Sequence, residues 1–148
     1  MTDWCGEGRQ GNHFCLRASD ADVVLQLVTK AVIKDDPRYL GTDSIRYAAL
    51  NFNALSKFGS LEFRQLRTPQ DFGKIKTWIS ILLNIKRNSF LFPNPRAVVE
   101  NFSVGGEEEF LRVMLGEHAG LFGHNEDRLW VLRRGVRVAQ EIAYARKW

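Results

Sequence analysis

One short segment constrains the fold more than any other part of the chain. Within the segment 60–66 (SLEFRQL), polar and apolar side chains alternate from residue 60 to residue 64, as they do in a half-buried strand. Because side chains alternate across a strand, Glu62 and Arg64 share one face and Phe63 lies on the other. Such a pair can present a metal ligand beside a phosphate clamp, or can form an ordinary ion pair on the solvent face of a sheet. Both interpretations remain open at this point.

Further patterns along the chain predict the other elements. Short connections without a β–α–β rhythm favour an antiparallel or mixed sheet with helices packed on one face. The chain is therefore predicted to be α+β, with a small sheet of about three to four strands and a helical C-terminal tail. Strands are expected at residues 13–18, 46–52 and 60–66, and helices at residues 19–34, 69–89, 95–102, 107–115 and 126–147.

The helix predicted over residues 69–89 has the clearest boundaries. Thr68 is expected to cap it, and Pro69 suits its first position because a missing N–H costs nothing there. Two prolines in the sequence FPNP then mark a linker. We therefore expect an α+β domain at 1–92 and a helical extension at 93–148, packed together as one compact unit. The predicted apolar stripe of the 69–89 helix consists of Phe72, Ile75, Trp78, Ile79, Leu82 and Leu83.

Bulk composition narrows the classes of protein that the chain can belong to. A hydrophobic content of 45% over 148 residues supports a packed core, and two cysteines do not make a disulfide framework. The net charge of +4 lacks the dense basic clustering of a dedicated duplex binder, so nucleic acid is only a weak candidate partner. The sequence shows no apolar run of membrane-spanning length and no export signal after Met1, so we expect a cytoplasmic protein.

Several short motifs in the region 46–85 follow one another in the order and with the spacing that a known family shows. A weaker match lies upstream at 11–16 (GNHFCL), where Cys15 occupies the position of a second histidine. Together these motifs resemble the C-terminal half of the amidoligase family, which belongs to the carboxylate–amine ligases with a glutamine synthetase-like fold. The resemblance covers roughly residues 11–90. Its main elements are Arg46-Tyr47, Leu50-Asn51, Ala54-Leu55, Gly59-Ser60-Leu61-Glu62-Phe63-Arg64 and Trp78-Ile79.

The resemblance implies a chemistry for named residues. An amidoligase joins a carboxylate to an amine through an acyl phosphate, at the expense of ATP. On that basis Glu62 would hold magnesium, Arg64 would steady the transferring phosphate, and His13 would line the pocket as a third catalytic candidate. Arg46 and Asn51 would join Glu62 and Arg64 in binding the nucleotide. The cofactors would be ATP and magnesium.

A different function is favoured because the family also needs an earlier strand with two acidic metal ligands. Residues 2–10 are too short for the half of the sheet that contains this strand, and their only acids are Asp3 and Glu7. We therefore expect a non-catalytic binding or inhibitory module without a cofactor, with the ligase as the alternative. A phage or mobile-element protein that acts on a host complex in the host cytosol would fit, since relatives of the family occur in such genomes.

Other candidate contacts are a sheet edge, a cationic helix edge and a zinc site. An exposed sheet edge could pair with a protein partner or with a second copy of the chain. Arg133, Arg134 and Arg137 form either a solvated edge of the last helix or a partner-docking face. His13 and Cys15 share a strand face, but zinc would require two further ligands, and no standard spacing provides them.

Overall fold

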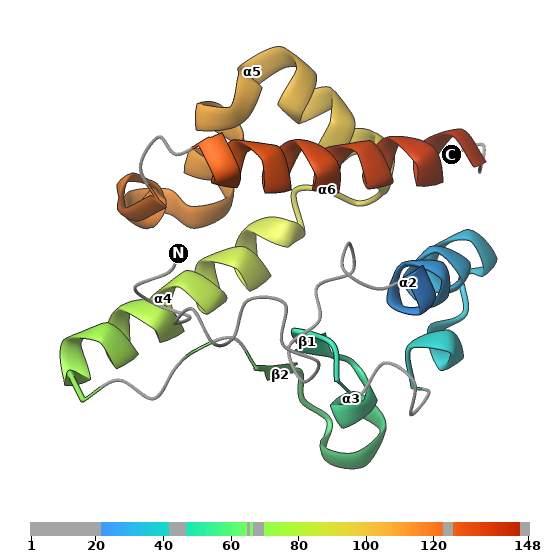
Figure 1. Cartoon of the computed structure of the whole chain (residues 1–148), viewed down its shortest axis with the longest axis horizontal. Helices are drawn as coiled ribbons and strands as arrows, with labels where there is room; N and C mark the ends of the chain where they lie inside the picture. The colour runs from blue at the N-terminus through green and yellow to red at the C-terminus, as the bar shows by residue number, and fades with distance from the viewer. Residues whose placement is uncertain (1–21, 42–46, 65, 67–69, 123–125, 146–148) are drawn as a thin grey trace. The chain divides into compact units, whose positions relative to one another are not determined.

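The chain divides into two compact units, Met1–Thr68 and Pro69–Trp148. The boundary expected between residues 92 and 93 falls inside the second unit. None of the described helices combines the length and apolarity that crossing a membrane requires. The computed structural model describes residues 22–41, 47–64, 66, 70–122 and 126–145 (Figure 1).

In the first unit, the main helix is α2 (Asp22–Lys34), where the sequence predicts one. It ends before Asp35, which adopts a left-handed backbone with φ of 51°. The short 3-10 helix η2 (Pro37–Gly41) follows, as expected from a proline that cannot continue the α-helix. A small core joins these elements to the next segment. It contains buried Val24 and Ala48, against which Leu27, Val28, Leu40 and Phe52 pack.

The sheet is much smaller than the sequence predicts. It has two antiparallel strands, β1 (Leu50–Asn51) and β2 (Glu62–Phe63), which pair Leu50 with Phe63 and Asn51 with Glu62. The prediction of an α+β fold with three to four strands is therefore wrong for the described part of the chain, which is mainly helical. The strand expected at 13–18 lies outside the described residues.

A helical turn connects the two strands. Helix α3 (Asn53–Phe58) lies between the strands predicted at 46–52 and 60–66, where the sequence predicts no helix. It ends at Gly59, whose φ of 66° places it in the left-handed region that glycine adopts at little cost. The chain winds into α3 shortly after β1, so the pairing of the two strands cannot extend further toward this connection.

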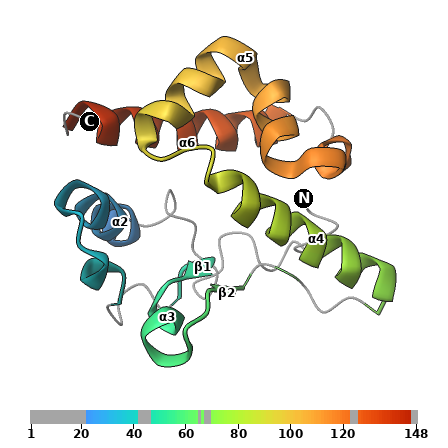
Figure 2. The same cartoon turned by 180° about the vertical axis from the view of Figure 1, so that it is seen from behind.

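The second unit contains the helices α4 (Phe72–Ser89), α5 (Pro95–Leu115) and α6 (Glu126–Ala145) and the 3-10 helix η4 (Gly116–Phe122). Both views show α5 bending and lying along α6 (Figures 1 and 2). The bend coincides with Gly106, which has non-helical dihedrals and separates the two helical segments predicted before and after it. Asn94 caps α5 by accepting a hydrogen bond from the backbone N–H of Ala97 at 3.0 Å.

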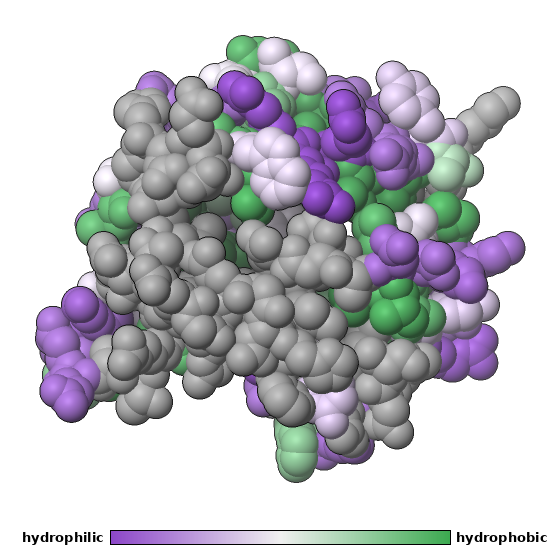
Figure 3. All heavy atoms as spheres, viewed as in Figure 1, coloured by the Kyte–Doolittle hydropathy of each residue, from purple (hydrophilic) through white to green (hydrophobic). Residues whose placement is uncertain are grey.

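Two predictions about α4 need correction. Its N-cap is Asp71, whose carboxylate accepts a hydrogen bond from the N–H of Gly73 at 2.7 Å, in place of the expected Thr68. The predicted apolar stripe is only partly buried, because three of its members face solvent and the other three are half-buried. The most buried residue of α4 is Ile81, which is only 2% exposed. On the face of the molecule drawn in Figure 3, hydrophobic residues reach the surface between hydrophilic ones. The exposed stripe members are Phe72, Ile79 and Leu83.

Asparagines identify the packed face of α4. Asn84 donates to the carbonyl oxygen of Leu115 at 3.0 Å, and Asn88 donates to that of Val113 at 2.7 Å. Both carbonyls belong to the last turn of α5, where no intrahelical N–H is available to them. The two amides therefore satisfy orphan acceptors and hold α4 against the end of α5.

Candidate binding site

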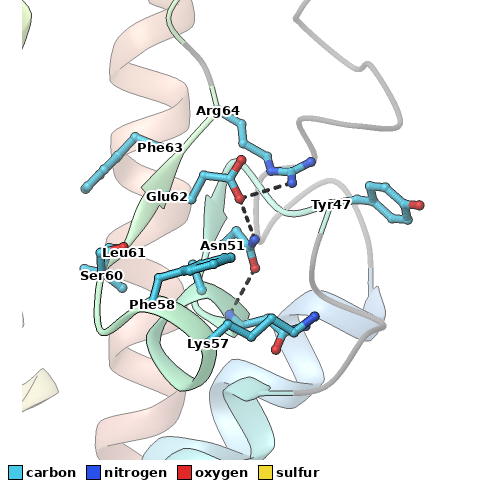
Figure 4. Close-up of a pocket in the computed structure, with 11 residues that line it drawn as sticks. Tyr47, Asn51, Lys57, Phe58, Ser60, Leu61, Glu62, Phe63 and Arg64 are labelled. Atoms are coloured by element: carbon cyan, nitrogen blue, oxygen red, sulfur yellow. Dashed lines mark hydrogen bonds and ion pairs between the residues drawn. The ribbon is translucent and has the colours of Figure 1, made fainter.

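The region from Tyr47 to Arg64 forms a hairpin whose connection contains α3, and one side of this hairpin is hollowed. The hollow is open to solvent and has a volume of about 740 Å³. Figure 4 shows the side chains that surround it. Its lining consists of Tyr47, Asn51, Asn53, Ala54, Lys57, Phe58, Ser60, Leu61, Glu62, Phe63 and Arg64.

Asn51 organises the polar part of this hollow. Its side chain is buried, and its Nδ2 donates to Oε2 of Glu62 at 2.7 Å (Figure 4). Its Oδ1 accepts from the backbone N–H of Asn53 at 3.0 Å, at the first turn of α3. A single amide therefore ties the start of α3 to the carboxylate on β2. This use of both amide atoms is the arrangement expected of a buried asparagine.

Arg64 completes the polar cluster from the other side. Its Nη2 donates to the same Oε2 of Glu62 at 3.1 Å, and its backbone N–H donates to the carbonyl oxygen of Ala49 at 2.9 Å. The guanidinium carbon lies 6.0 Å from the centre of the Tyr47 ring, within reach of a cation–π contact. The side chain of Arg64 is 25% exposed and that of Glu62 is 46% exposed. Solvent therefore reaches the ion pair but does not surround it.

These neighbours change the acidity of Glu62. The hydrogen bond from Asn51 is the largest cause that lowers the pKa of Glu62 below its ordinary value. Partial burial opposes this effect, whereas the hydrogen bond and the positive charge of Arg64 lower the pKa further. Glu62 is consequently held in its ionised form, with one of its two oxygens accepting both donors.

Apolar side chains lie exposed around this cluster. Phe58 is 79% exposed, and Leu55, Leu61 and Phe63 are also exposed. Lys57 adds a second cation to the lining. A small domain gains little stability from a phenylalanine that is mostly in water, so these side chains are available for contact with another molecule.

The structure brings together three of the residues that the sequence analysis selects for a site. Asn51 and Arg64 both donate hydrogen bonds to Glu62, whereas Arg46 and His13 lie outside the described residues. Within the described ranges, no group of three or more His, Cys, Asp or Glu residues could hold a metal ion. Lys57 and Phe58 were not predicted as site residues, because their place in the lining of the hollow depends on helix α3, which the sequence does not predict.

The three arginines proposed as partner contacts are all exposed on α6, but their surroundings differ. Arg133 forms an ion pair with Glu107 of α5, and Arg134 lies 5.2 Å from the centre of the Trp130 ring. Arg133 therefore has a structural role within the second unit. A partner contact at Arg134 and Arg137 stays a prediction.

Comparisons of the chain with protein-family models, with curated proteins and with solved structures find no match. The resemblance to the amidoligases consequently remains a hypothesis that rests on the motifs in the sequence.

Proposed function

We propose that this chain is a non-catalytic protein-binding module that contacts its partner through the hairpin hollow. The observation that carries the proposal is the combination of an internally bonded ion pair with a rim of exposed apolar side chains. Interfaces of this kind place apolar or aromatic anchors around a few polar groups that fix orientation. The sheet edge expected to recruit partners is only two residues long, so side chains contribute most of the contact surface.

The engagement of Glu62 supports recognition over metal chemistry. Its Oε2 already accepts hydrogen bonds from Asn51 and Arg64, and the guanidinium offsets its charge. A magnesium ion bound there would have to compete with the nearby cation and would still need several other oxygen ligands. A protein segment needs only to place an apolar side chain against Phe58 and a donor near Glu62. We assign this binding to a cytosol, where a phage-encoded chain would meet a host protein complex.

Site-specific photo-crosslinking tests this proposal. A benzoylphenylalanine placed at Phe58 should capture a discrete partner from the cytosol in which the chain is expressed, or a second copy of the chain. The matched control carries the same group at Tyr144, an aromatic residue that is 89% exposed on α6. Because both positions lie in water, unspecific capture should be equal. Equal capture patterns at the two positions would refute a role for the hairpin.

An ATP-dependent carboxylate–amine ligase is the second candidate. It is favoured by one observation: Asn51, Glu62 and Arg64, which the resemblance assigns to the nucleotide site, line one hollow of a size typical of ligand pockets. Calorimetry with ATP and magnesium would detect binding at millimolar concentrations or tighter. The ligase hypothesis requires Glu62→Gln to weaken this binding while the unfolding midpoint stays close to that of the wild type. Absence of binding by the wild type would exclude it.

A further inference from the structure

Helix α4 has two opposite faces with different surroundings. One face contains Ile81 and the two asparagines that bond to the last turn of α5. The other face lies half a turn away, because nine residues at 100° each place Phe72 opposite Ile81. The large apolar side chains on this second face are between 50% and 79% exposed. They are Phe72, Ile79, Leu83 and Phe90, the last of which is the C-cap residue of α4.

The exposed face has the spacing of a coiled-coil seam. When Lys76 and Lys86 are included, its residues follow each other at alternating intervals of four and three, which keep side chains in one row along a helix. Eighteen residues separate its ends, or about 27 Å at 1.5 Å per residue. This is long enough to contact several turns of another helix. We call this row the α4 seam; it consists of Phe72, Lys76, Ile79, Leu83, Lys86 and Phe90.

The charges on α4 indicate what kind of helix fits the seam. Lys76 and Lys86 are exposed and occupy seam positions, and Lys76 Nζ lies 5.0 Å from the centre of the Phe72 ring. Helix α4 also carries Lys74 and Arg87 but no Asp or Glu. A second copy of α4 would bring like charges together in a partly dry interface, which is costly. A helix with acidic residues opposite the two lysines would instead form ion pairs there.

We propose that the α4 seam docks an amphipathic helix of a partner protein that combines Leu, Ile or Phe with Asp or Glu opposite Lys76 and Lys86. The inference rests on the proposed protein-binding function and adds a second contact surface to it, on the other unit. Apolar contact along the seam supplies affinity, and the two lysines select the acidic sequence.

Two peptides of 21 residues test the selection by charge. Both carry leucines with heptad spacing, and they differ in having Glu or Lys at the two positions that meet Lys76 and Lys86. Fluorescence anisotropy with the full chain should show at least tenfold tighter binding of the Glu peptide. The double variant Lys76→Glu/Lys86→Glu should reverse this preference. The control Lys30→Glu/Lys34→Glu changes the net charge equally on α2 and should leave the preference unchanged within about twofold.

Leu83→Ser tests whether the seam is the contact surface. It should weaken binding of the Glu peptide at least tenfold and lower the midpoint of thermal unfolding by no more than about 2 °C, the small effect of serine's lower helix propensity. A larger fall of the midpoint would show that the chain itself covers the seam, and a wild-type dimer dissociated by Leu83→Ser would show that a second copy does. Either result, or equal affinity for both peptides, overturns the inference. Peptide binding without crosslinking at Phe58 would refute the hairpin proposal alone.

Discussion

Asn51 of β1 donates from its side-chain amide to the carboxylate of Glu62 at 2.7 Å, and Glu62 is its pairing partner on β2. The two residues are eleven positions apart in the sequence. The bond connects the segment before α3 with the segment after it, and so keeps the two ends of the α3 connection together. A polar cluster therefore contributes what a longer strand ladder would contribute in a larger sheet.

We expect Asn51→Ala to destabilise the first unit. The substitution removes the donor to Glu62 and the acceptor for the N–H of Asn53, so the expected loss in the free energy of unfolding is about 1–3 kcal/mol. Urea denaturation of the full chain measures it.

The matched control is Asn101→Ala in α5, because Oδ1 of Asn101 is buried without a hydrogen-bond partner. Alanine also has the higher helix propensity, so the control should be close to neutral. Equal losses would contradict the role given to Asn51.

The lowered pKa of Glu62 predicts a dependence on pH. Because this pKa is lower in the folded chain than in the unfolded chain, the ionised carboxylate contributes stability above the unfolded value of about 4.3. That contribution is lost as the pH falls through the folded pKa. A carboxyl-carbon NMR titration should show the pKa of Glu62 rising toward its ordinary value in Asn51→Ala. It should also rise in Arg64→Ala, which removes both a hydrogen bond and a positive charge from the carboxylate. An unchanged pKa in either variant would contradict the role given to the residue that was replaced.

Prolines marked helix boundaries, whereas alternation overpredicted the strands. The helices α2, α5 and α6 lie close to their expected positions. Pro37 follows the end of α2 and Pro95 begins α5, because a proline acts on the backbone of its own and of the preceding residue. Alternation within residues 60–66 shows only that a segment could have two faces, and it cannot show how many residues find a pairing partner.

The same limitation applies to the buried face of α4 and to the site. Counting apolar residues selects the stripe with Phe72, Ile79 and Leu83, yet the packed face is the one whose Asn84 and Asn88 satisfy carbonyls of α5. A half-buried asparagine needs an acceptor from another part of the fold, and the sequence of one helix does not show where that acceptor lies. The proximity of Glu62 and Arg64 was predictable because it depends on a spacing of two. The approach of Lys57 was not, because it depends on α3.

The ion pair between Glu107 and Arg133 should contribute more than a typical surface pair. It joins α5 to α6, and the side chain of Glu107 is only 20% exposed, so solvent screens it less. A double-mutant cycle with Glu107→Gln and Arg133→Gln should give a coupling free energy near the upper end of the 0–1 kcal/mol range for exposed pairs. The control is Glu109 and Arg112, a pair within α5 whose side chains are 39% and 68% exposed. A larger coupling in the control pair would contradict the prediction.

Gly106 and Gly135 should respond in opposite directions to the same substitution. Gly106 has φ of 71° and ψ of −170° at the bend of α5, a combination that is almost restricted to glycine. Gly106→Ala should therefore lower the free energy of unfolding by about 1–3 kcal/mol, although a Cβ at this position would meet no atom within 4 Å.

Gly135 lies inside α6, and a Cβ there also meets nothing within 4 Å. Gly135→Ala should stabilise the chain by up to about 1 kcal/mol, because glycine is a poor helix former. Since neither alanine clashes, opposite shifts of the thermal unfolding midpoint would be due to the different backbone conformations of the two glycines. A higher midpoint for Gly106→Ala would show that α5 does not need this bend.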